Sequence, residues 1–260
     1  MASDYYFGHG EAWLATRTTG GLPSDFDISL PEINSLTLSL GREKVEHVSK
    51  RTSVAGKDLV LTRLVSLTGV MNISTHTKEM LELYLYGDIV AVAGGAFAAT
   101  AFEDTSIVVG QTVRIPGGKK NLSSLVLTDS TGSPVTLTLN THYEIVDIDA
   151  GLVRFLDVTT GSVVQPFKAA GSEGAGSNVG ILKQRQFEKW MLFKGINIAD
   201  DDKVCTVDLY KVQFEPAANW TLLNDGGEVN AYELNFEALI DTTLDDSNAL
   251  GRHGHYKELA

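Results

Sequence analysis

Hydrophobic and polar residues alternate with a period of two in several segments of the chain, which predicts strands with one buried face. The alternation is regular in residues 35–40, where Leu36, Leu38 and Leu40 are expected to share one side of a strand. It returns in residues 232–238, where the expected inward positions are Tyr232, Leu234, Phe236 and Ala238. The positions between them form a polar stripe, Glu233, Asn235 and Glu237. The chain is therefore expected to be mainly β.

A longer alternating segment, residues 59–73, predicts an unusually long strand. Its phase is shared by Leu59, Leu61, Val65, Leu67, Met71 and Ile73. At about 3.3 Å per residue this strand would span roughly 50 Å. We therefore expect it either to bend at Gly69 or to extend beyond the body of the domain. The preceding residues 41–57 are too polar for a core and are expected to form an extended arm or a long hairpin.

One short helix is predicted over residues 78–86. Thr77 is a suitable N-cap, and Glu79 lies in the first turn, where the helix dipole favours an acid. Gly87 is expected to close the C-terminal end. Apolar residues at helical spacing form a stripe that is expected to pack on a sheet: Met80, Leu81, Tyr84 and Leu85.

Two stretches rich in small residues, 91–101 and 169–177, are expected to be flexible linkers. They bracket residues 96–177, which are expected to form an inserted all-β module, with an immunoglobulin-like module as one candidate. Residues 1–95 and 178–260 would then form one discontinuous β domain. Inside the module, residues 135–139 predict a strand, and residues 143–148 and 152–156 predict a hairpin around a turn at 149–151.

The remaining segments give weaker patterns. Residues 22–28 are expected to form a loop, and residues 190–193 and 204–214 predict strands. The phase of the apolar residues changes within 204–214, which predicts a bulge near Tyr210 or burial on both faces. Residues 225–227 mark a turn, and residues from Asp245 onward lack periodicity and are expected to be mobile.

Composition limits the classes of function. The 260 residues carry 33 acidic and 21 basic side chains, a net charge of −12, so general affinity for nucleic acid is not expected. The single cysteine, Cys205, excludes an internal disulfide and a multi-thiolate metal site. No apolar run reaches membrane-helix length and the start lacks a signal-peptide core, so we expect the chain to fold in a reducing cytoplasm without membrane insertion.

The charge is unevenly distributed. Residues 42–63 have a net charge of +3, whereas residues 200–260 have a net charge of −9. These two surfaces could meet, within one subunit or between copies; the alternative is a solvated loop and an acidic face that keeps the protein soluble. The charged residues of the predicted arm are Arg42, Glu43, Lys44, Glu46, Lys50, Arg51, Lys57, Asp58 and Arg63.

Motifs for catalysis or cofactor binding are weak. His253 and His255 lack a third metal ligand, and residues 200–202 predict a turn rather than a calcium loop. The glycines of residues 171–176 are not followed by the lysine and helix of a phosphate loop, and Cys205 lies in an apolar strand, where a thiol is usually inert. We therefore expect no enzyme activity, no catalytic or metal-ligating residues and no cofactor. Two alternatives stay open, a pair of carboxylates across a cleft and a sugar platform formed by Trp13, Trp190 and Trp220.

The order of these elements, with five short motifs, resembles the major tail tube protein of long non-contractile-tailed (siphovirus-type) bacteriophages. The motifs are residues 10–16 (GEAWLAT), 22–28 (LPSDFDI), 193–197 (FKGIN), 207–216 (VDLYKVQFEP) and 231–238 (AYELNFEA). The resemblance covers about residues 1–95 and 178–260. The insert, with residues 141–145 (THYEI) before its turn, resembles β modules that decorate some relatives.

The resemblance implies a β-sandwich or barrel-like body with one flanking helix, in a virion tail assembled in the host cytoplasm. Copies would form hexameric rings that stack into a hollow tube, and the genome would pass through it into the host. The partners it implies are the chain itself, the tape-measure, tail terminator and distal tail proteins, and DNA in transient, non-specific passage. The arm would contact a neighbouring subunit or ring, and the stripe at 233–237 is one candidate for the lumen face. The alternative is a two-domain β binding module, such as an adhesin or tail-tip component, that contacts the host surface or carbohydrate.

Overall fold

The structure is a computed structural model that describes residues 8–30, 32–51, 56–185, 187–223, 226–227, 230–245 and 247–259. Residues 52–55 of the predicted arm and Asp225 of a predicted turn lie outside these ranges. The fold is mainly β, with 54% strand and 5% helix. The chain divides into two compact units, Met1–Ile89 with Val179–Ala260, and Val90–Asn178. The boundaries expected from the sequence, 95/96 and 177/178, lie close to these positions.

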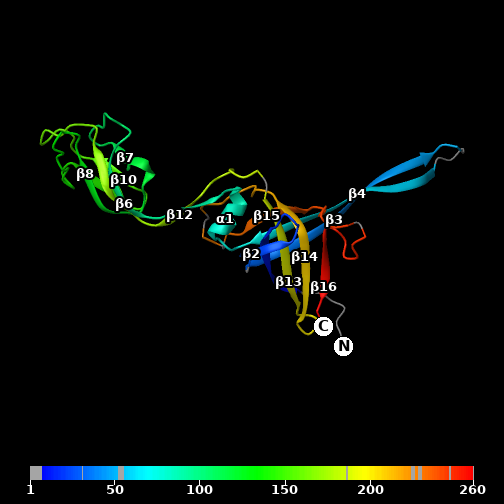
Figure 1. The fold of residues 1–260 in the computed structure, drawn as a ribbon. Helices are drawn as coiled ribbons and strands as arrows, with labels where there is room; N and C mark the ends of the chain where they lie inside the picture. The colour runs from blue at the N-terminus through cyan, green and yellow to red at the C-terminus, as the bar shows by residue number, and fades with distance from the viewer. Residues whose placement is uncertain are drawn as a thin grey trace. The chain divides into compact units, whose positions relative to one another are not determined.

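Unit 1 is built on one antiparallel sheet in the order β2-β1-β13-β14-β15-β4-β3, with β16 paired to β14 (Figure 1). Its strands are β1 (Gly8–Arg17), β2 (Pro23–Leu30), β3 (Ile33–Ser49), β4 (Gly56–Ile73), β13 (Phe187–Asn197), β14 (Lys203–Phe214), β15 (Tyr232–Ala238) and β16 (Gly254–Glu258). One hydrophobic core contains Leu30 of β2, Met191 of β13 and Met71 of β4. Strands from opposite ends of the sheet therefore pack together, and the body is sandwich-like.

The central strand β14 shows how the sheet changes partners. Its residues 205–209 pair with β16, whereas Val212–Phe214 pair with β15. The register against β13 shifts between Lys189 and Met191, which places an extra residue of β14 near Tyr210. The bulge expected from the change of phase is therefore confirmed. Cys205 and Leu209 before the bulge are buried, as are Val212 and Phe214 after it, because the bulge lets both phases of the strand face apolar neighbours.

The one α-helix in the described ranges, α1 (Lys78–Leu85), packs on this core. The Thr77 hydroxyl accepts a hydrogen bond from the Met80 N–H at 3.2 Å, as expected of an N-cap. The left-handed residue at the C-terminal end is Tyr86, with φ 49°, one position before the expected Gly87. Met80, Leu83, Tyr84 and Leu85 are buried, and the Tyr84 ring lies 5.0 Å from the ring of Tyr232.

Unit 2 contains two three-stranded sheets, β7-β10-β9 and β6-β11-β8, around a second core. The Phe155 ring stacks on the Phe167 ring at 5.0 Å in the centre of that core. The chain enters this unit through β5 and leaves it through β12, which pair with each other. The elements are β5 (Ile89–Val92), β6 (Gly95–Ala101), β7 (Thr112–Arg114), the 3-10 turn η1 (Pro116–Gly118), β8 (Leu122–Thr128), β9 (Tyr143–Asp147), β10 (Leu152–Phe155), β11 (Lys168–Glu173) and β12 (Gly176–Val179).

The two stretches of small residues are not flexible linkers; that expectation is wrong. They form strands β5, β6, β11 and β12. At one of their glycines other segments approach closely: a Cβ added at Gly171 would lie 3.1 Å from the Ser123 carbonyl and 3.2 Å from the Phe97 ring. A composition typical of linkers therefore belongs here to paired strands.

Three further expectations are also wrong. Residues 22–28 are mostly edge strand β2 rather than a loop, and their side chains alternate poorly because only Ile28 and Leu30 reach the core. The C-terminal segment after Asp245 includes β16, which is held by backbone pairing to β14 and so needs no apolar period. Residues 135–139 form only isolated bridges, because the Asp129 carboxylate takes the Val135 N–H at 2.7 Å.

Asp129 organises this part of unit 2. Its buried carboxylate accepts hydrogen bonds from the backbone N–H groups of Val135 (2.7 Å), Thr131 (3.3 Å) and Val164 (3.2 Å). Burial alone would raise the pKa of this carboxyl, but the hydrogen bonds outweigh burial and hold the pKa below its ordinary value. The ionised group is therefore part of the folded structure.

We expect Asp129→Asn to lower the melting temperature of unit 2 by roughly 10 °C at pH 7, because an amide cannot accept all of these bonds. A lowered pKa in the folded state stabilises the fold above the unfolded pKa, and this gain is lost as the pH falls. The difference between variant and wild type should therefore shrink below about pH 4. Calorimetry of the whole chain at pH 7 and pH 3 measures both effects, with the exposed Asp149→Asn as control. Equal melting temperatures at pH 7 would contradict this role.

Candidate functional site

The β3–β4 hairpin is the feature of unit 1 that extends furthest from its core (Figure 1). The two strands pair from Ile33 opposite Ile73 out to Ser49 opposite Gly56. Strand β15 pairs with β4 only over residues 67–73, so among the described strands the outer part of the hairpin consists of β3 and β4 alone. At about 3.3 Å per residue this outer part is roughly 30 Å long. The sequence predicted both an arm and a strand that extends beyond the body, and the two are one hairpin.

One face of the outer hairpin, here called its apolar face, carries three exposed apolar side chains, beside His47, which lies opposite Leu59. Val45 lies directly opposite Leu61, and Leu59 is the next residue of β4 on that face. Their exposed fractions are 47%, 53% and 49%. A two-stranded hairpin is only marginally stable in water by itself. Grouped, exposed apolar side chains are typical of interaction surfaces.

Charged side chains of the hairpin pair mostly with one another across its strands. Lys57 pairs with Glu46, Arg63 with Glu43 at 3.5 Å, and His47 with Asp58 at 2.6 Å. The contact with Lys57 also lowers the pKa of Glu46. Arg42 donates a hydrogen bond to Thr62. Five of the nine charged positions expected to face a partner are therefore held in ion pairs within the hairpin, and Arg42 is held in a hydrogen bond, which the sequence did not reveal.

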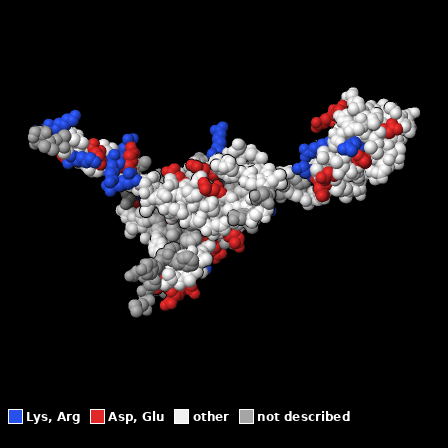
Figure 2. Space-filling model, turned by 180° about the vertical axis from the view of Figure 1, so that it is seen from behind, with Lys and Arg blue, Asp and Glu red and all other residues white. Residues whose placement is uncertain are grey.

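Four cations of the hairpin make no ion pair within the described ranges, Arg42, Lys44, Lys50 and Arg51, and all four are exposed. Figure 2 shows basic side chains gathered along this arm. Lys50 and Arg51 follow directly after β3, at its outer end. Two of the four cations without an ion pair therefore lie at the tip of the hairpin.

The polar stripe of β15 belongs to a wider polar face. Glu233, Asn235 and Glu237 lie opposite Asn72, Val70 and Thr68 of β4, which in turn lie opposite Ser35, Thr37 and Ser39 of β3. The Asn72 amide donates to the Ser35 hydroxyl at 2.9 Å across these strands. The nine residues include two carboxylates and no lysine or arginine. This surface, here called the polar face, carries only negative charge.

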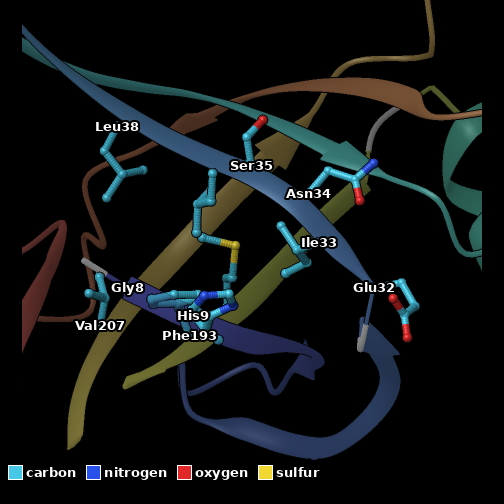
Figure 3. Close-up of a pocket in the computed structure, with 12 residues that line it drawn as sticks. Gly8, His9, Glu32, Ile33, Asn34, Ser35, Leu38, Phe193 and Val207 are labelled. Atoms are coloured by element: carbon cyan, nitrogen blue, oxygen red, sulfur yellow. The ribbon is translucent and has the colours of Figure 1, made fainter. Parts of the chain in front are cut away.

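A groove of about 500 Å³ lies on the other side of β3 (Figure 3). It is lined by residues of β1, β3, β13 and β14, among them Leu38, Phe193 and Val207. His9 and Glu32 are its titratable residues, so it holds one carboxylate rather than the pair that sugar hydrolysis uses. Its lining mixes apolar side chains with the polar groups of Asn34 and Ser35.

The other candidate residues occupy structural positions. Trp190 donates its indole N–H to Asp208 at 3.1 Å, and the Tyr210 hydroxyl lies 2.9 Å from Nδ1 of His255. Trp220 packs on the core, and Trp13 is half-buried. Residues 200–202 form a turn, and the free thiol of Cys205 is buried. Within the described ranges, no group of three or more His, Cys, Asp or Glu residues could hold a metal ion.

In the described ranges, no helix is both long and apolar enough to cross a membrane.

The chain was compared with known proteins and protein families. No curated protein matches it. Residues 5–257, nearly the whole sequence, match a family whose description is "Protein of unknown function UCP028589". The chain belongs to this family.

Proposed function

We propose that this chain is the structural subunit of a bacteriophage tail tube. Copies assemble into hexameric rings, and the rings stack into a conduit with a negatively charged lining through which the genome passes into the host. The observation that carries the proposal is the β3–β4 hairpin, whose outer part exposes the apolar side chains of Val45, Leu59 and Leu61 in the part of unit 1 that the structure describes. It is supported by the resemblance of the motif order to tail tube proteins.

Unpaired sheet edges and exposed apolar side chains of the single subunit favour assembly through the hairpin. In the described sheet of unit 1, β2 and β3 are edge strands, each with one side that pairs with no other strand. Such edges pair readily with a second chain. The apolar face of Val45, Leu59 and Leu61 supplies burial, and the cations at the tip supply orientation toward an acidic surface. Asp201 and Asp202, exposed in the turn after β13, are acidic groups of the kind that the tip fits.

The polar face is the surface best suited to line the conduit. Its two carboxylates repel DNA phosphates, and it offers no lysine or arginine that would hold DNA by releasing counterions. On this face the Asn72 amide donates a hydrogen bond to the Ser35 hydroxyl, so its polar side chains partly satisfy one another. Unit 2 then lies outside the conduit, because a module of its size would obstruct it. The tape-measure, tail terminator and distal tail proteins are the further partners in this proposal.

Electron microscopy of the purified chain at rising concentration tests the proposal directly, with rings or tubes expected. The double variant Lys50→Glu, Arg51→Glu is expected to raise the concentration at which tubes form by about tenfold or more, because it reverses the charge of the tip. Added salt should weaken wild-type assembly for the same reason. The same charge change in unit 2, Lys168→Glu with Arg154→Glu, is the control. A chain that stays monomeric under every condition contradicts the proposed function.

A further inference from the structure

Unit 2 contains a polar cavity of about 530 Å³ that the proposed assembly role does not use. Its walls are residues 117–121, which run from η1 to the start of β8, and residues 173–178, which run from the end of β11 through a short turn into β12. Val92 and Ala175 are the only lining residues with purely hydrocarbon side chains. The volume lies in the range of small-molecule sites, whereas the lining is unlike that of a site for an apolar ligand.

Positive charge is concentrated around this cavity. Unit 2 holds five lysine and arginine residues against eight acids, a net charge of −3. Three of the five, Arg114, Lys119 and Lys120, line the cavity, and Glu173 is its one carboxylate. The cavity is therefore a basic site on an acidic unit, which favours a ligand with negative charge.

The cationic groups are held in place by contacts with the cavity walls. The Arg114 guanidinium lies against Gly118, where an added Cβ would be 3.4 Å from its Cζ, and its Nη2 donates to the Gly118 carbonyl at 3.4 Å. Lys119 forms an ion pair at 2.6 Å with Glu173, which lies 54 residues further along the chain. The Lys119 Nζ also lies 5.9 Å from the centre of the Phe97 ring. Gly117 and Gly118 have φ of 71° and 64°, which other residues rarely adopt.

One cation is left without an internal partner. Lys120 is exposed and makes no ion pair in the part of the chain that the structure describes. With the Lys119–Glu173 pair neutral overall, Arg114 and Lys120 leave a charge of about +2. A phosphate or a carboxylate is the group that this charge complements.

The remaining lining groups are typical of a site for hydroxyls. Asn121, Ser177 and Asn178 carry amides and a hydroxyl that both donate and accept hydrogen bonds, and Glu173 accepts them. A Cβ added at Gly176 would meet no atom within 4 Å, so the cavity is open beside this residue. We propose that this cavity binds an anionic saccharide, a sugar that carries a phosphate or a carboxylate, with the anion on Lys120 and Arg114 and the hydroxyls on the amide and glutamate side.

The inference is independent of tube assembly and is tested on the full-length chain below its assembly concentration. Calorimetric titration with glucose 6-phosphate, glucuronate, inorganic phosphate and glucose is expected to show binding of at least one anionic sugar at about 10 mM or below. Lys120→Glu should weaken that binding about tenfold or more and leave the melting temperature unchanged, because Lys120 makes no ion pair to lose. The matched control is Lys168→Glu, a lysine of the same unit outside the cavity, with no change expected.

The four probes separate the outcomes. Binding of glucose 6-phosphate but not of glucuronate assigns the anion as phosphate, and the reverse assigns it as carboxylate. Inorganic phosphate that binds as tightly as the sugar phosphate overturns the saccharide part of the proposal. The site itself is overturned if neither anionic sugar binds at about 10 mM. It is also overturned if Lys120→Glu binds the sugar as tightly as the wild type does.

Discussion

The variant Leu59→Asp, Leu61→Asp is expected to remain a folded monomer and to form no tubes at concentrations where the wild type assembles. Both leucines are about half exposed in the single chain, 49% and 53%, so the monomer loses little stability. In a tube the aspartates would be buried against another copy, and an unpaired buried carboxylate costs several kcal/mol. This effect should exceed that of charge reversal at the hairpin tip, because rim charges mainly guide association.

Electron microscopy reports assembly, and sedimentation with circular dichroism verifies that the variant is a folded monomer. Leu222→Asp with Leu223→Asp is the matched control, because these leucines are 70% and 89% exposed in the same unit but lie off the hairpin. Normal tubes from the Leu59, Leu61 variant would remove the apolar face of the hairpin from the interface. Loss of tubes in both variants would point to a general effect of added charge.

Strands with one buried face could be predicted from the sequence. Residues 232–238 alternate because Leu234 and Phe236 face the core while Glu233 and Glu237 face solvent. The hairpin of unit 2 was predicted equally well: β9 and β10 flank a turn in which Gly151 has φ 70°. In both cases burial or turn geometry constrains each residue directly, so the pattern is local.

Elements that depend on distant backbone could not be predicted. Strand β16 exists because β14 offers it unpaired backbone groups, and its own side chains carry no period. Strands β6 and β11 consist largely of small residues, and at Gly171 of β11 the Ser123 carbonyl and the Phe97 ring approach closely. In such segments the constraint comes from the neighbour, which the sequence does not show.

The candidate site divides in the same way. The hairpin and its charge could be predicted from polarity and strand length, but the pairs of Glu46 with Lys57 and Glu43 with Arg63 depend on a register that two irregularities shift. The stripe at 233–237 was visible as one strand. Its extension through Thr68 and Thr37 appears only once β15, β4 and β3 are placed side by side.

Replacing Gly69 with alanine is expected to destabilise the protein strongly, although it adds only one methyl group. The sequence predicted a bend as one reason for this glycine, but β4 runs unbroken from Gly56 to Ile73. Gly69 lies opposite Phe236, and an added Cβ would overlap the Phe236 ring. That ring is buried and lies 5.5 Å from the ring of Phe214, so it has little room to move. Gly69→Ala is therefore expected to lower the free energy of unfolding by about 3 kcal/mol.

Denaturant unfolding of the whole chain measures this change, and Gly56→Ala is the control. Gly56 begins the same strand, and an added Cβ would meet nothing within 4 Å there, so its replacement should be nearly neutral. Phe236→Leu in the Gly69→Ala background should cost less than the sum of the two single changes, because the smaller side chain leaves space for the methyl group. Strict additivity, or equal stability of the two alanine variants, would show that the glycine serves the backbone of β4 rather than the aromatic ring across from it.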